Sequence, residues 1–203
     1  NATFSRDKFY GSKPPREVQL DALNGVIDAL EEDDATQLVA ACGTGKTYMH
    51  RQLLRHAMDA EDSNGIGVIL TSSIRLAHDT AADLRPTDGY DESLGKFGED
   101  YEVVEVHSGA TGEEGRQSVK VDGVISVDRI YKQIDQALKD GKKVVIVSTY
   151  DSVNKVQEAQ ARFEDSDKVE ADLLIHDEAH NILGQQKPTT VASDDNDLTA
   201  YVG

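Results

Sequence analysis

Cysteine, tryptophan and long apolar stretches are scarce or missing in this chain of 203 residues. The one cysteine, Cys42, excludes an internal disulfide bond and favours a reducing compartment. No apolar run approaches the length that crosses a bilayer, and the polar amino-terminal segment lacks the apolar centre of a secretory signal. We therefore expect a cytoplasmic protein that does not engage a membrane.

Basic residues are also few. The chain carries 21 Lys and Arg against 38 Asp and Glu, which gives a formal net charge of −17 at pH 7. Acidity of this kind favours solubility and says little about the fold. It argues against the broad basic face with which many proteins bind nucleic acid.

The most informative stretch runs from Leu38 to Thr47. A short apolar run, which we interpret as the end of a strand, leads into Gly-Thr-Gly-Lys-Thr and then into a predicted helix. Free backbone N–H groups at a helix start form an anion site, and glycines let the backbone approach a phosphate closely. The predicted phosphate loop consists of Ala41, Cys42, Gly43, Thr44, Gly45, Lys46 and Thr47. Lys46 can reach the β- and γ-phosphates, and the Thr47 hydroxyl can ligate Mg²⁺.

Strand-like and helix-like segments alternate along the chain, and its length suits a single α/β domain. The apolar pattern predicts helices over residues 16–30, 46–60 and 126–138, and strands over residues 65–70, 101–107, 144–147 and 171–176. This order predicts a parallel sheet with helices on both faces, which binds nucleotide at the carboxyl ends of the strands.

A second group of chemical interest, Asp177-Glu178-Ala179-His180, follows the last predicted strand. Mg²⁺ takes one or two carboxylates together with phosphate oxygens, so we expect Asp177 to hold it from a strand beside the phosphate-loop strand. Glu178 can then orient and deprotonate the attacking water. His176 and His180 stand four apart as in zinc proteases, but that site needs His-Glu-x-x-His on a helix, so zinc is disfavoured.

Taken together, these motifs resemble the first RecA-like domain of superfamily 2 DEAD/DEAH-box helicases, closest to the restriction-enzyme type (type III restriction subunit-like). Ala40 stands where the strict phosphate-loop pattern has glycine, and this variant is common in that superfamily. Residues 71–78 resemble motif Ia, although the usual Pro and Gln are replaced by Thr71 and His78. The pair formed by residues 126–128 and 148–152 also occurs in this group, with Asp151 in place of Gln.

The resemblance assigns further roles. It implies that Gln19, in an Arg-x-x-Gln element that begins at Arg16, reads the adenine edge, and that His180 couples the nucleotide site to the rest of the motor. It also implies contacts with a nucleic-acid backbone from Thr71, Ser72, Arg75, Ser148 and Thr149. Plainer alternatives remain open: Gln19 as a solvent-facing helix residue, a simple strand–helix junction after Thr71, and a helix capped by Ser148 or Asp151.

The implied function is ATP binding and hydrolysis, with Mg²⁺, by a nucleic-acid-dependent helicase or translocase that acts on DNA in preference to RNA. The chain lacks both the Ser/Thr-Ala-Thr motif of the family and a second RecA-like domain, so we expect residues 1–203 to be a truncated first domain with poor turnover. Two other classes remain: a P-loop enzyme such as a small-molecule kinase, disfavoured by Asp-Glu-Ala-His, and a non-catalytic module that binds nucleotide or a partner.

Overall fold

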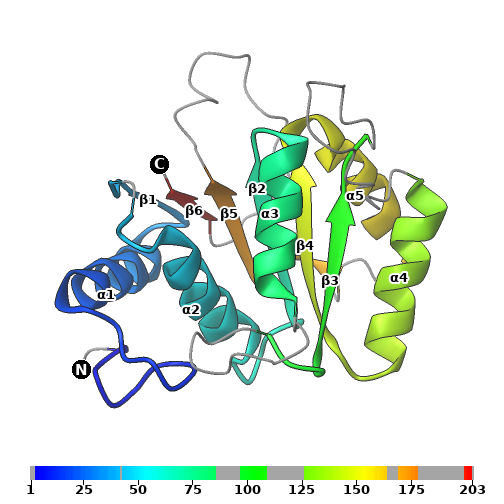
Figure 1. Ribbon diagram of the computed structural model, residues 1–203. Helices are drawn as coiled ribbons and strands as arrows, with labels where there is room; N and C mark the ends of the chain where they lie inside the picture. Colours follow the sequence, from blue (N-terminus) through cyan, green and yellow to red (C-terminus); the bar gives the residue numbers. More distant parts are fainter. Residues whose placement is uncertain are drawn as a thin grey trace.

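The computed structural model describes residues 3–41, 43–85, 97–108, 126–163, 169–177 and 199–202. Within this part of the chain a six-stranded sheet has the order β1-β6-β5-β2-β4-β3, and every neighbouring pair is parallel (Figure 1). The strands are β1 (Ala35–Leu38), β2 (Ile66–Thr71), β3 (Tyr101–Val106), β4 (Lys143–Thr149), β5 (Leu173–Asp177) and β6 (Thr199–Val202). The expected fold class, an α/β protein with a RecA-like parallel sheet, is confirmed.

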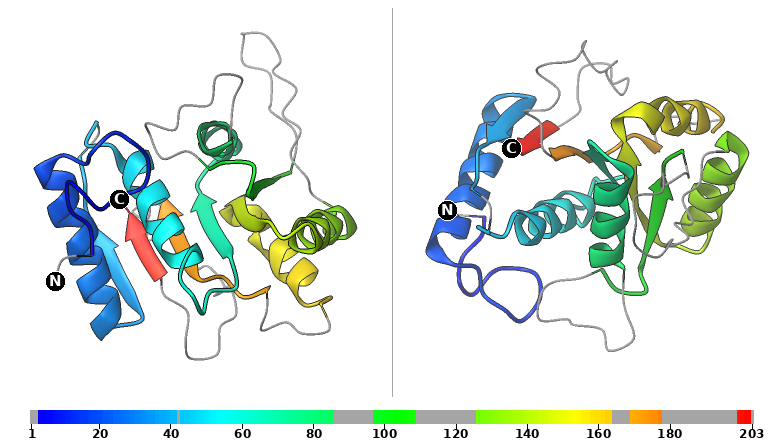
Figure 2. Two further views of the ribbon diagram at one scale, coloured as in Figure 1. Left: turned by 90° about the horizontal axis from the view of Figure 1, so that it is seen from below. Right: turned by 45° about the horizontal axis from the view of Figure 1, so that its top comes forward.

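Helices cover both faces of the sheet, as the alternation of segments predicts (Figures 1 and 2). One face carries α1 (Glu17–Glu32), α2 (Lys46–Met58) and α3 (Ile74–Leu84), and the other carries α4 (Val127–Lys139) and α5 (Val153–Gln160). A 3₁₀ turn, η2 (Tyr150–Ser152), joins β4 to α5. None of the helices in the described ranges is long and apolar enough to cross a bilayer.

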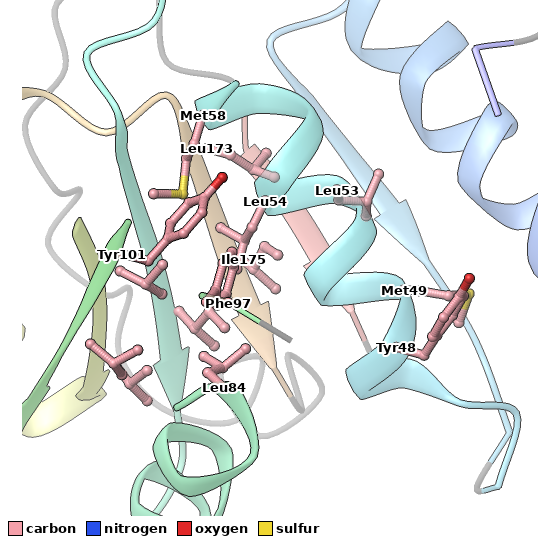
Figure 3. Packing of buried hydrophobic residues seen from close by; sticks show 14 of the residues in the cluster. Tyr48, Met49, Leu53, Leu54, Met58, Leu84, Phe97, Tyr101, Leu173 and Ile175 are labelled. Carbon is pink, nitrogen blue, oxygen red and sulfur yellow. The ribbon is translucent and has the colours of Figure 1, made fainter. Parts of the chain in front are cut away.

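Side-chain alternation along the strands divides the core into two layers. Val145 and Val147 of β4 face α2 and α3, whereas Val144 and Ile146 face α4 and α5. Figure 3 shows the first layer, in which apolar side chains of α2 pack over β5 and against Phe97 and Tyr101, the first residue of β3. This layer includes Leu53, Leu54, Met58, Phe97, Tyr101, Leu173 and Ile175. α2 therefore covers the face of the sheet to which the side chains of Leu173 and Ile175 in β5 point.

The sequence-based boundaries of α1, α2, α4, β2 and β3 agree with the structure to within two residues. The phosphate-loop strand differs, because β1 ends at Leu38 and the apolar residues that follow lie beyond it, with Val39 79% exposed. β1 is an edge strand, and its side chains are exposed or half-buried. Its sequence therefore lacks the continuous apolar run that is typical of a buried parallel strand. β6 lies outside every segment that the apolar pattern predicts to be a strand.

A buried carboxylate ties α3 to the edge strand β3. Glu105 is 3% exposed, and its Oε2 accepts a hydrogen bond from Arg85, which caps the end of α3, at 3.1 Å. Its Oε1 lies 3.2 Å from His78 Nδ1 of α3 and 2.9 Å from His107 Nε2. A charge this deeply buried depends on such donors, because it has given up its hydration.

We predict that Arg85→Ala lowers the free energy of unfolding by roughly 1–3 kcal/mol, because it strips a charged donor from a buried carboxylate. Urea unfolding measures this change. The matched control is Arg75→Ala, whose side chain is 89% exposed and pairs with Asp79 on the same helix, so its effect should stay below about 0.5 kcal/mol. Equal effects of the two substitutions would contradict the role given to Glu105.

His50 provides a pH-dependent contribution to stability. Burial lowers its pKa to about 4, and the positive charges of Lys46 and Arg51 act in the same direction. In the unfolded chain this imidazole binds a proton as the pH falls below about 6.5. In the folded chain it stays neutral until the pH approaches about 4. The free energy of unfolding should therefore fall in this window by up to about 1.4 kcal/mol for each pH unit.

Urea unfolding between pH 7 and pH 4.5 tests this expectation when wild type is compared with His50→Gln. The variant should lose a smaller part of its stability on acidification, whatever its stability at pH 7. If both proteins lose the same amount over this range, His50 is not held neutral in the folded state.

Candidate nucleotide site

The loop between β1 and α2 has the backbone that the sequence predicts for a phosphate loop. Gly43 and Gly45 adopt left-handed conformations, with φ of 80° and 93°. α2 begins at Lys46, and its N-cap is Gly45, which brings no side-chain oxygen to this helix end. The N–H groups of the first turn thus point towards an end of the helix where an anion can bind, and the helix dipole favours negative charge there.

Hydrogen bonds within the phosphate loop and from the start of α1 fix the conformation of the loop. The Thr44 N–H and hydroxyl both donate to the Ala41 carbonyl oxygen, at 3.3 and 2.8 Å. The Thr44 carbonyl oxygen in turn accepts hydrogen bonds from Arg16 Nη2 at 2.7 Å and from Gln19 Nε2 at 2.8 Å. Arg16 and Gln19 therefore meet the phosphate loop at a single carbonyl group.

Gln19 is 6% exposed, so it is not a solvent-facing helix residue. Its amide oxygen accepts from the backbone N–H of Arg16 at 2.9 Å, which closes the first turn of α1. An amide has two N–H donors and two acceptor positions, and these two bonds use one of each. These two bonds leave one donor and one acceptor position of the amide without a role in the loop contact, and the adenine contact of Gln19 stays a prediction.

Asp177 is the last residue of β5, at the carboxyl edge of the sheet (Figure 1). Alternation places its side chain on the same face as Leu173 and Ile175, and α2 covers this face. Lys46 and Thr47 form the first turn of the same helix. The parallel sheet therefore places Asp177 at the same edge as the loop that precedes α2.

β6 separates the two strands that were expected to be neighbours. It pairs with β1 on one side and with β5 on the other, so the prediction that the strand of Asp177 lies beside the phosphate-loop strand was wrong. Two strand spacings amount to about 10 Å. α2 bridges this gap, because it leaves the loop after β1 and packs over β5 and β2.

Three of the five residues expected to contact nucleic acid lie at the same edge, at the ends of β2 and β4. Thr71 pairs with Thr149 in the sheet register, and Leu70 pairs with Ser148. Thr71 and Ser148 are fully buried and Thr149 is 5% exposed. The Thr71 hydroxyl donates to the Ser73 carbonyl oxygen, and the Ser148 hydroxyl donates to the Thr149 carbonyl oxygen.

The surface beside this buried group is formed by the start of α3. Ser73 is the N-cap of the helix, and its hydroxyl accepts from the Leu76 N–H at 3.3 Å. Ser72 and Arg75 are exposed there. Of the expected contacts, these two side chains are the ones that a backbone phosphate can reach directly.

Sequence reasoning overlooked Tyr150 and gave His176 no part beyond the zinc alternative. The Tyr150 hydroxyl donates to the Asp177 carbonyl oxygen at 3.1 Å, and its ring stacks on His176 with centroids 5.8 Å apart. Burial lowers the pKa of His176 to about 4. Residues 148–152 resemble a helicase motif, but nothing in the sequence connects Tyr150 to a residue 27 positions away.

Cys42, Glu178 and His180 lie outside the described residues, so their expected roles stay predictions. The same holds for the zinc alternative, which needs His180. Among the residues that are described, no cluster of three or more His, Cys, Asp or Glu side chains could hold a metal ion. Thr47 and Asp177 can still serve Mg²⁺, which retains several waters and takes phosphate oxygens as ligands.

The fold is similar to solved structures of Type ISP restriction-modification enzymes. One is a nuclease-deletion mutant of LlaGI in complex with a DNA substrate mimic, with 24% identity, a TM-score of 0.68, and coverage of 94% of this chain and 17% of that chain. Another is ATP-dependent LlaBIII bound to DNA, with 22% identity, a TM-score of 0.64, and coverage of 95% and 12%. This chain thus spans a small part of either enzyme.

No curated protein matches the chain. A family model described as "Type III restriction enzyme, res subunit" (ResIII) matches residues 12–199, from the segment before α1 to the start of β6. The matched residues include the phosphate loop, the ends of β2 and β4, and Asp177. This protein therefore belongs to the ResIII family of type III restriction enzyme res subunits.

Proposed function

We propose that this chain is the ATP-binding, first RecA-like domain of a DNA-dependent ATPase that works as a helicase or double-strand translocase. The observation that carries the proposal is the end of α2, where two left-handed glycines precede Lys46 and the face of β5 that bears Asp177 lies under the same helix. This arrangement combines an anion site with a carboxylate, which is what a magnesium nucleotide requires.

Each group at this site has a separate task. The N–H groups at the start of α2 and the Lys46 ammonium bind the phosphates and stabilise the charge that develops on them. Thr47 and Asp177 would hold Mg²⁺, which would supply positive charge to neutralise the phosphates. Glu178 takes the proton from the attacking water. His180 couples this centre to the rest of the motor.

Arg16 and Gln19 place the loop and the base. Their shared contact with the Thr44 carbonyl oxygen fixes the loop before nucleotide binds, so less order has to be gained on binding. The unused donor and acceptor of the Gln19 amide pair with adenine. This assignment gives the Gln19 amide contacts with both the protein and the ligand.

DNA is the proposed partner because LlaGI and LlaBIII are each described in complex with DNA or a DNA mimic. With a net charge of −17, the chain cannot rely on a basic surface. We assign the contact to Ser72, Arg75 and the N-terminal N–H groups of α3, which bind phosphates without many cations. Thr71, Ser148 and Thr149 are buried at the paired ends of β2 and β4, next to this surface.

Because the chain covers a small part of either structural neighbour, hydrolysis and translocation are proposed for a longer protein. A second RecA-like domain would complete the ATPase centre. Residues 1–203 alone should bind nucleotide and turn it over slowly. Robust DNA-stimulated hydrolysis by these residues alone would contradict the need for that second domain.

Lys46→Ala should weaken the binding of a fluorescent ATP analogue with Mg²⁺ at least about tenfold, because the phosphates lose their one lysine contact. A titration followed by fluorescence anisotropy measures the dissociation constant. The matched control is Lys132→Ala, an exposed lysine of α4 on the opposite face of the sheet, which should leave binding unchanged. Equal affinity of wild type and Lys46→Ala would refute the proposed site.

Gly45→Ala should abolish measurable nucleotide binding and destabilise the fold by about 1–3 kcal/mol. A Cβ on Gly45 would overlap the Gln19 side-chain amide, and φ of 93° is strained for any L side chain. Gly141→Ala is a close control, because Gly141 has a φ of 71° but no atom within 4 Å of a built Cβ. The control should lose stability and keep binding. If Gly45→Ala binds nucleotide as well as Gly141→Ala does, the loop has another conformation in the protein.

A further inference from the structure

Tyr150 connects two strands that are not neighbours in the sheet. It directly follows Thr149, the last residue of β4, whereas His176 and Asp177 belong to β5, and β2 lies between the two strands. Its hydroxyl donates to the Asp177 carbonyl oxygen at 3.1 Å. The Tyr150 side chain therefore spans the carboxyl end of β2 and reaches the backbone of the residue that we assign to Mg²⁺.

Two contacts define the position of the Tyr150 ring. It stacks on His176 with centroids 5.8 Å apart and an angle of 15° between the ring planes. His176 is 5% exposed, and Tyr150 packs against the core layer between the sheet and α4 and α5. The ring is thus held on one face of the sheet, while the Asp177 side chain lies on the other face, towards α2.

The hydrogen bond acts on the backbone carbonyl group of Asp177 and does not involve its carboxylate. The Tyr150 hydroxyl thus fixes the direction of the Asp177 carbonyl group, which belongs to the backbone at the end of β5. Movement of Tyr150 would turn this carbonyl group and, with it, the end of β5. The Tyr150 hydroxyl is therefore able to set the position of the metal-binding carboxylate without touching it.

The other end of the connection is the edge that we assign to DNA. Thr149 pairs with Thr71 in the sheet, and Thr71 leads through Ser72 into the N-cap of α3. A shift of this edge on binding DNA would move the covalently attached Tyr150. The path from the DNA surface to Asp177 then consists of one strand pair, one side chain and one hydrogen bond.

We propose that Tyr150 is a positioning residue that couples DNA binding to the ATPase centre through its hydrogen bond with the Asp177 carbonyl group. This inference rests on the proposed function. It concerns regulation of the same site and gives Tyr150 no contact with ATP or with the reacting atoms.

Tyr150→Phe tests the coupling, because it removes the hydroxyl and keeps the stacked ring. In the protein of full natural length, we expect the kcat of ATP hydrolysis at saturating duplex DNA to fall about fivefold or more, the size expected for one lost hydrogen bond. The basal kcat without DNA should fall less than the DNA-stimulated kcat, so the ratio of the stimulated rate to the basal rate should fall. The melting temperature, measured alongside, should change by a few degrees at most.

The matched control is Tyr131→Phe, which removes a hydroxyl from a tyrosine that packs on Phe163 between α4 and the end of α5. It should retain full stimulation by DNA. Tyr150→Leu, which removes both the ring and the hydroxyl, should lose stimulation to at least the same extent as Tyr150→Phe.

Three results would contradict this account, and each points to a different error. Undiminished stimulation in Tyr150→Phe would overturn the coupling role. A parallel fall of basal rate, nucleotide affinity and melting temperature would also overturn it, because Tyr150 would then be a purely structural residue. A wild-type protein that binds nucleotide but is not stimulated by DNA would overturn the proposed function itself.

Discussion

The parallel direction of all the paired strands is the constraint on which the rest of the structure depends. It sends the carboxyl ends of β2, β4 and β5 to one edge, together with the loop that leaves β1. Side chains from distant parts of the sequence, such as Thr71, Thr149 and Asp177, meet there for this reason alone. Helices on both faces then bury the apolar residues that alternate along the strands, and α2 brings the phosphate loop over the sheet.

The Thr44 carbonyl oxygen is the local centre of the candidate site. It takes hydrogen bonds from Arg16 and Gln19, and the loop that bears it can form only because Gly45 has no Cβ where the Gln19 amide lies. The start of α1 and the start of α2 are in this way a single unit. A nucleotide that contacts the Gln19 amide and the loop would therefore contact two helices whose relative position is already fixed, which lowers the entropy cost of binding.

The local parts of this architecture could be predicted from the sequence. Helical periodicity fixed α1, α2 and α4 because it depends on neighbouring residues only, and Gly-Thr-Gly-Lys-Thr identified the turn because few other residues adopt positive φ. The order of the strands could not be derived, since it is determined by pairing between distant segments. β6 illustrates this limit: four residues, without a distinctive pattern, enter the sheet between β1 and β5. Tyr150 illustrates it for the site, because its role depends on a contact across an intervening strand.

The most direct test of this account is a crystal structure of the chain with Mg²⁺ and a non-hydrolysable ATP analogue. The account predicts phosphate oxygens on the N–H groups at the start of α2, and a magnesium ion between the Thr47 hydroxyl and the Asp177 carboxylate, bound directly or through water. The Arg16 and Gln19 contacts with Thr44 should persist. Phosphates bound elsewhere, or a metal ion that Asp177 does not approach, would contradict the site proposed for this domain.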